Sequence, residues 1–132
     1  MYLLDTTIFS FMLRNDTRLK LYEDELSSNA TFFLSAMTVL ELHSGAELRG
    51  WGVKRRDEME HHIGRFTVLP IDANLAQPYA RAIAVSRAAG NELKPPDALI
   101  LASGRHFGLV VLTHDRDMLI GDELGIDVIC RV

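Results

Sequence analysis

Short apolar runs alternate with helical stretches along the chain, and this alternation limits the folds open to it. Runs rich in branched and aromatic residues predict strands at residues 2–4, 31–34, 67–71, 109–112 and 127–130. Helical spacing of apolar residues, helped by cap residues, predicts helices at 6–13, 18–26, 36–48, 54–66, 72–90 and 96–107. Strands joined by helices favour an α/β fold: a three-layer α/β/α sandwich around a mostly parallel sheet of about five strands.

Length and composition are consistent with one domain spanning residues 1–132. The chain has 132 residues, 48% of them hydrophobic, which is enough to bury a core without disulfides or a structural metal. Its one cysteine, Cys130, supports neither a disulfide framework nor a Cys-rich zinc site, so we expect a reducing, cytoplasmic setting. Asp5 interrupts any signal-peptide core, and no apolar run approaches a membrane span, so no membrane association is expected.

The formal net charge of -4 argues against a simple basic coat for nucleic acid. The chain has one compact basic cluster, Lys54, Arg55 and Arg56, with Arg49 upstream. We interpret this cluster as a solvated helix face in preference to a patch that attracts phosphates.

Three aspartates occupy related positions in the predicted fold. Asp5 and Asp115 follow strands predicted to be buried, and Asp97 lies at the start of a helix. In open α/β sheets, ligands bind outside the carboxyl ends of the strands, so Asp5 and Asp115 should share one edge of the molecule. Taken singly, each aspartate is better explained as a helix cap that meets the positive end of a helix dipole.

Glu41 does not fit the capping explanation. It lies within a helix between Leu40 and Leu42, where a lone charge would be costly unless the face is only partly buried, at a rim. A cation would account for all four carboxylates, because otherwise they would repel and raise one another's pKa values. Oxygen donors without a His pair or Cys favour Mg²⁺, with Mn²⁺ as a possible substitute. Asp117 has two equal interpretations, a helix first-turn charge or a metal role.

Several other chemistries are excluded by their missing motifs. The chain has no phosphate-binding P-loop, dinucleotide-binding glycine motif, serine nucleophile elbow or HExxH zinc motif. A phosphatase that forms an aspartyl-phosphate would need a second Asp where this chain has Thr7. His114, next to Asp115, and the other histidines are interpreted as surface or core residues.

Four segments together resemble PIN-domain ribonucleases, most closely the VapC toxins of toxin–antitoxin (VapBC) systems. The segments are YLLDT at residues 2–6, LSAMTVLEL at 34–42, PDALILA at 96–102 and LTHDRD at 112–117. The resemblance covers the entire chain, and it is the order and spacing of the four segments that make it specific.

The resemblance implies an endoribonuclease that hydrolyses RNA phosphodiester bonds, leaving a 5′-phosphate and a 3′-hydroxyl. Asp5, Glu41, Asp97 and Asp115 would be the catalytic and metal-binding quartet for one or two Mg²⁺ ions. Asp117 would be an accessory acid, and Thr113 and Thr6 supporting hydroxyls. Two positions depart from the family pattern: Thr7 replaces the usual Asn, and Met118 replaces a frequent aromatic residue.

The same resemblance implies three partners: an RNA substrate, a VapB-like antitoxin that blocks the acidic site, and a second copy in a homodimer. Five apolar residues of the first two helical segments are candidates for an antitoxin groove, and core packing explains them equally well: Phe9, Phe11, Leu13, Leu19 and Tyr22. The alternatives are a PIN nuclease of cellular RNA processing without an antitoxin, and a catalytically idle PIN-like binding module. The sequence carries no readable code for the RNA that is cut.

Overall fold

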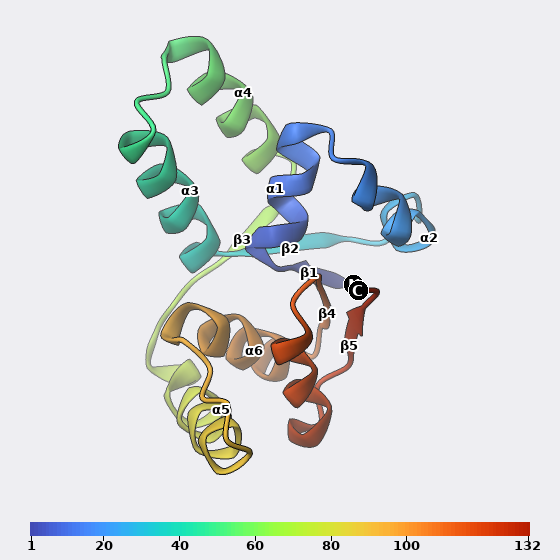
Figure 1. The fold of residues 1–132 in the computed structure, drawn as a ribbon, viewed down its shortest axis with the longest axis vertical. Helices are drawn as coiled ribbons and strands as arrows, with labels where there is room; N and C mark the ends of the chain where they lie inside the picture. The colour runs from blue at the N-terminus through green and yellow to red at the C-terminus, as the bar shows by residue number, and fades with distance from the viewer.

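The computed structural model describes residues 1–132, which form a sheet of five parallel strands with helices on both faces (Figure 1). The strand order is β3-β2-β1-β4-β5. The strands are β1 (Tyr2–Leu4), β2 (Phe32–Ser35), β3 (Thr67–Leu69), β4 (Val110–Thr113) and β5 (Val128–Cys130). From β1 the chain builds outward to β3, and it then crosses to the other side of β1 to form β4. The strand order therefore reverses between β1 and β4.

The helices form one layer on each face of the sheet, as Figure 1 shows. One layer contains α1 (Thr6–Arg14), the 3₁₀ helix η1 (Thr17–Tyr22), α2 (Glu23–Leu26), α3 (Ala36–Leu48) and α4 (Val53–Ile63). The other contains α5 (Ala76–Ala88), α6 (Pro95–Phe107) and the 3₁₀ helix η3 (Arg116–Leu124), with the short η2 (Ala73–Leu75) leading into α5. None of these helices combines the length and apolarity needed to cross a membrane.

Alternation along the central strands divides the core between the two layers. Leu3 and Val111 are fully buried in the cluster with α5 and α6, whereas Leu4 and Leu112 are fully buried in the cluster with α1 and α3. Successive side chains of a strand point to opposite faces, so a strand covered on both sides must be apolar throughout. The predicted three-layer α/β/α fold is confirmed, and the sheet is parallel throughout.

The helical stretch predicted at residues 18–26 is a 3₁₀ helix followed by one α-helical turn. The Asp16 side chain accepts a hydrogen bond from the Arg18 backbone N–H and so starts η1. The backbone at Tyr22 leaves the helical region and separates η1 from α2. This break directs the Tyr22 ring into the core, where it is fully buried.

Other predicted boundaries move by a few residues for local reasons. Asp72 caps the 3₁₀ turn η2, so the α-helical part of the predicted 72–90 helix begins at Ala76. Helix α4 ends at Ile63, and a turn follows in which Phe66 packs edge-on against the Phe9 ring. Helix α6 begins at Pro95, one residue before the predicted start, because its first positions need no backbone donor.

We predict that Gly104→Ala destabilises the protein although alanine favours helices. A Cβ at Gly104, in α6, would lie 2.8 Å from Cγ2 of Val111 and 3.4 Å from Cγ2 of Ile126. Overpacking of about 1–3 kcal/mol outweighs a helix-propensity gain of up to about 1 kcal/mol. Urea denaturation should therefore show a lower free energy of unfolding.

Gly64→Ala is the matched control, because its added Cβ would come no closer than 3.4 Å, to a carbonyl of its own helix. It should change stability less than Gly104→Ala. A Gly104→Ala variant as stable as the parent would show that α6 is not held tightly against β4.

Candidate functional site

Asp5 lies at the point where the strand order reverses. It follows β1, and its backbone N–H donates to the carbonyl of Leu112 in β4 at 2.8 Å. The side chain is 3% exposed, and both its oxygens are held: Oδ1 accepts from the Thr6 backbone N–H, and Oδ2 from the Thr113 hydroxyl, each at 2.7 Å. Burial raises the pKa of Asp5 to about 6; the Thr113 hydrogen bond opposes this, and the charges of Asp97 and Asp115 add to it.

Asp115 reaches the same edge of the sheet from the end of β4. Its backbone N–H donates to the Thr113 hydroxyl oxygen at 3.1 Å, and its Oδ1 accepts from the Asp117 backbone N–H at 2.9 Å, which caps η3. The Thr113 hydroxyl therefore donates to Asp5 while it accepts from Asp115. One buried threonine fixes the spacing between the two strand-end residues.

Asp97 is the third residue of α6, and its carboxylate has neither a hydrogen bond nor a salt bridge. Burial raises its pKa to about 6, helped by the charges of Asp115 and Glu41, while Lys94 opposes the increase. These couplings place Asp97 within the field of the other carboxylates. Of the four carboxylates, only that of Asp97 accepts no hydrogen bond that would offset its negative charge.

Glu41 is oriented by a chain of hydroxyl groups. The Thr6 hydroxyl donates to Oε1 of Glu41 at 2.9 Å, and it lies 2.9 Å from the Thr38 hydroxyl. Since Thr6 has a single hydroxyl proton and gives it to Glu41, Thr38 must be the donor in the second hydrogen bond. Thr38 is completely buried, and sequence reasoning missed it; its position one helical turn before Glu41 was the available signal.

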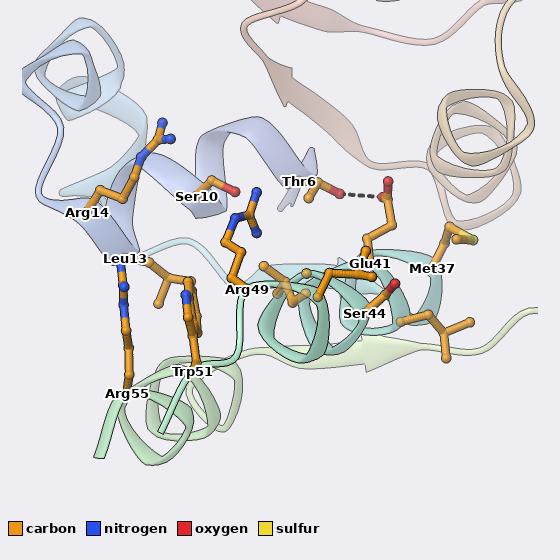
Figure 2. A pocket seen from close by; sticks show the side chains of 14 residues that line it. Thr6, Ser10, Leu13, Arg14, Met37, Glu41, Ser44, Arg49, Trp51 and Arg55 are labelled. Atoms are coloured by element: carbon orange, nitrogen blue, oxygen red, sulfur yellow. Dashed lines mark hydrogen bonds between the residues drawn. The ribbon is translucent and has the colours of Figure 1, made fainter. Parts of the chain in front are cut away.

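The face of α3 that carries Glu41 is only partly buried. Leu40 is 59% exposed and Leu48 is 85% exposed, so this face of α3 is open to solvent. Glu41 is half-buried in the wall of a groove of about 630 Å³ that lies between α1, α3 and the start of α4 (Figure 2). The rim position left open by the sequence therefore explains how the helix tolerates the charge. Glu41 shares this groove with its helical neighbours Met37 and Ser44.

The four carboxylates fit a hard cation that keeps part of its water shell. None of them forms a salt bridge, and Asp5 and Asp97 have raised pKa values caused in part by their neighbours. No three acidic, His or Cys side chains are grouped closely enough to hold a metal ion by themselves. Mg²⁺ is commonly held by one or two carboxylates and several waters, so the donor type suits it and a closed cage is not required.

The accessory residues have distinct surroundings. Asp117 is exposed, and its Oδ1 accepts from the Asn91 side-chain amide at 2.7 Å. Met118, a residue of η3, is fully buried in the core, which explains how it can replace an aromatic residue there. Thr7 is half-buried in α1, and its hydroxyl has no hydrogen-bond partner.

Tyr22 is a second residue that sequence reasoning did not connect with the site. Its hydroxyl donates to the carbonyl of Thr113 at 2.7 Å and accepts from the Arg131 backbone N–H at 3.0 Å. It also lies 2.7 Å from Nδ1 of His114, which must therefore carry the proton of that hydrogen bond. His114 packs edge-on against Phe11 as well, so it is held within the fold, as the sequence favoured.

The sequence left two explanations open for five apolar residues: an antitoxin groove or core packing. Core packing is the correct explanation for three of them. Phe9, Phe11 and Tyr22 are buried and cannot line a surface groove. Leu13 does line the groove beside Glu41, and Leu19 is only partly buried.

Comparison with known proteins gives matches over almost the whole chain. Residues 2–122 match the PIN domain. Plasmid stability protein StbB of Pseudomonas syringae pv. tomato is 33% identical over 124 residues, which cover 87% of this chain and 88% of that protein. Toxin FitB of Neisseria gonorrhoeae is 30% identical, with 96% of each chain covered.

Two solved structures share the fold. VapBC2 from Rickettsia felis, bound to a DNA fragment from its promoter, matches with a TM-score of 0.81 at 15% identity, over 98% of this chain and 97% of that one. FitAcB from Neisseria gonorrhoeae matches with a TM-score of 0.78 at 30% identity, over 97% and 96% of the two chains.

We predict that Asp97→Asn stabilises the metal-free protein at neutral and higher pH. The pKa of Asp97 is about 6 in the folded protein against an ordinary 3.8, so its contribution to stability is complete below about 4 and is lost as the pH rises through 6. The asparagine variant avoids that loss. In EDTA it should melt a few degrees above the parent at pH 8, and this difference should vanish near pH 4.

Asp122→Asn, which removes an exposed carboxylate of η3, is the control and should show no such pH-dependent difference. If Asp97→Asn melts at or below the parent temperature at pH 8, the carboxylates do not repel one another as described.

Proposed function

This chain belongs to the PIN domain family, and from that premise we propose that it is a Mg²⁺- or Mn²⁺-dependent endoribonuclease that acts as a toxin. The observation that carries the proposal is the arrangement of Asp5, Glu41, Asp97 and Asp115. Two of them follow neighbouring strands at the reversal of strand order, where open α/β sheets bind their ligands. Burial, with the charges of neighbouring carboxylates adding to it, raises the pKa values of Asp5 and Asp97, and such shifts are common at functional sites.

In the proposed reaction, water attacks the phosphorus of an RNA phosphodiester, and the bond to the leaving 3′-oxygen breaks. A bound divalent ion would supply positive charge beside the phosphate and lower the pKa of a water molecule. Asp5 and Asp97 are the first choice for direct ligands of the ion. Asp115 and Glu41 would complete the site directly or through water.

The supporting residues hold these carboxylates in place before any ion binds. The Thr113 hydroxyl fixes Oδ2 of Asp5, so that carboxylate cannot rotate freely. Thr6 fixes Oε1 of Glu41 and donates its backbone N–H to Oδ1 of Asp5. Such preorganisation limits the cost of ordering the site during the reaction. Asp117, held by Asn91, would add negative charge at the edge of the site.

We further propose a cognate VapB-like antitoxin as partner, a homodimer as the assembly, and the cytoplasm as the place of action. The support is similarity: relatives are named as a toxin and as a plasmid stability protein, and the fold neighbours were solved as VapBC2 and FitAcB.

We predict RNA cleavage that depends on Mg²⁺ or Mn²⁺ and that EDTA abolishes. Asp5→Ala and Asp97→Asn should each lower the cleavage rate by more than about 100-fold, since residues that only support metal ligands already cost 10- to 100-fold. Thr113→Val, which removes the hydroxyl that holds Asp5, should fall in that lower range. Rates are measured on total RNA and on a labelled oligonucleotide, with circular dichroism to show that each variant folds.

Asp122→Asn, which removes an exposed carboxylate outside the quartet, is the matched control and should cleave RNA at the rate of the parent. Cleavage that continues in EDTA, or an Asp97→Asn variant as fast as the parent, would refute the metal-dependent mechanism.

Expression in a bacterial host distinguishes a toxin from an RNA-processing enzyme. Inducing the parent chain should arrest growth because uncontrolled RNA cleavage is harmful, whereas inducing Asp97→Asn should not. Co-expression of a short reading frame from directly upstream of the gene should restore growth and yield a complex on purification. Normal growth with the active parent, or the lack of such a reading frame, would favour the processing enzyme. An idle binding module would show equal growth and no cleavage.

A further inference from the structure

The groove beside Glu41 contains two arginines that the protein itself does not neutralise. Arg49 and Arg55 both line the groove, and neither forms a salt bridge. Arg56, next in sequence, is engaged differently: it pairs with Glu47 and donates to the carbonyl of Trp51. Arg49 and Arg55 are both exposed, which agrees with the solvated face favoured by the sequence, and both also line the groove.

Both guanidinium groups are supported by their neighbours in the groove. The guanidinium carbon of Arg55 lies 4.2 Å from the centre of the Trp51 ring, so the group is stacked on the indole. Arg49 folds back over Gly45, where an added Cβ would lie 2.6 Å from its Nη1. Glycine at this position leaves the space in which the Arg49 guanidinium rests. The Trp51 ring thus holds the Arg55 guanidinium, and the absence of a side chain at Gly45 leaves room for the Arg49 guanidinium.

The groove carries opposite charges at its two ends. Figure 2 shows Arg55, Trp51 and Arg14 together at one end and the Thr6–Glu41 hydrogen bond at the other, with Arg49 between them. We infer that this groove binds one single-stranded segment of the RNA, with backbone phosphates on Arg49 and Arg55, and leads it to the acidic site. The inference rests on the proposed ribonuclease function and specifies how the substrate is held.

The chemistry of the groove favours a nucleic-acid strand. Guanidinium groups match phosphate oxygens through paired hydrogen bonds, and an arginine or aromatic face can stack on an unpaired base. At about 630 Å³ the groove has the size of a small-ligand pocket, which suits a few nucleotides of one strand. Leu13 and Leu48 add apolar surface for base faces.

An acidic peptide is the competing occupant. It would also neutralise the two arginines, but further carboxylates along the peptide would lie beside Glu41 and be repelled. An RNA strand would also be repelled where a phosphate lies beside the carboxylates, but the metal ion of the proposed reaction would neutralise the charge at that point. The position of the groove beside the acidic site therefore supports RNA.

The test measures binding separately from cleavage. The full chain, in EDTA, is titrated into a short fluorescein-labelled single-stranded RNA of mixed sequence, and fluorescence anisotropy gives Kd at several salt concentrations. Arg49→Gln and Arg55→Gln should each weaken binding about 5- to 10-fold and reduce the slope of log Kd against log salt by about 0.7, the value for one phosphate contact on a single strand. Arg81→Gln, an exposed arginine of α5 on the opposite face of the sheet, should change Kd less than about 2-fold.

Gly45→Ala provides a test in which no charge is lost. Alanine inside α3 should raise the melting temperature, because glycine is a poor helix former and only the flexible Arg49 side chain must move. The same substitution displaces the Arg49 guanidinium, so RNA binding should weaken about 3-fold or more. A variant that is more stable and yet binds RNA less well cannot be explained by damage to the fold.

Cleavage in Mg²⁺ is measured on the same proteins to separate the two proposals. If the parent cleaves RNA while Arg49→Gln and Arg55→Gln bind and cleave like Arg81→Gln, the groove inference fails and the ribonuclease function stands. If binding depends on Arg49 and Arg55 but no metal restores cleavage, the ribonuclease proposal fails and the groove assignment stands. The inference is also overturned if the parent fails to bind the RNA, or if a glutamate- and leucine-rich peptide binds instead in an Arg49-dependent way.

Discussion

The pairing of β1 with β4 is the contact on which the rest of the structure depends. These strands lie far apart in sequence, and their register, with Leu4 opposite Leu112, brings Asp5 and Thr113 together. The hydrogen bond from the Asp5 backbone to Leu112 and that from the Thr113 hydroxyl to Asp5 both follow from this register. A shift of one residue would turn Leu4 to the opposite core and move Asp5 away from Thr113. Apolar packing of the strands and placement of the acidic edge are therefore set by the same register.

Capping and metal binding looked like competing explanations of the aspartates, but the structure makes them compatible. Asp115 caps η3 with one oxygen, and Asp5 accepts the first backbone N–H of α1. A capping hydrogen bond uses part of a carboxylate and orients the remainder, because its position relative to the helix becomes fixed. Asp97, which makes no such bond, is free to respond to a cation. Capping therefore orients the carboxylates of Asp5 and Asp115, while that of Asp97 keeps a charge that no hydrogen bond offsets.

The sequence predicted the features that depend on local pattern and on strand order. Parallel strands, helices on both faces and an acidic edge after β1 and β4 follow from apolar alternation and from the rule that ligands bind at the carboxyl ends. It did not predict Thr38 or Tyr22, whose roles depend on partners far away in sequence, Thr6 for one and Thr113 for the other. It also placed Phe9 and Phe11 among candidates for a surface groove, because periodicity reports an apolar face without saying whether that face is covered.

The charges around the groove show why net charge is a poor guide to what this protein binds. The whole chain carries -4, yet Arg49 and Arg55, which are exposed and form no salt bridge, both line the same groove. Charges of one sign gathered along a groove raise the local potential, so two neighbouring cations can attract a ligand that a diffuse negative excess would otherwise repel. The charge also changes sign along the groove, from positive at Arg55 and Arg49 to negative at Glu41. A polyanion drawn toward the arginines would approach the carboxylates next, and a divalent cation bound among them would lower the repulsion that it meets there. In the proposed complex, the groove and the acidic site would together favour a ligand that carries phosphates at regular intervals.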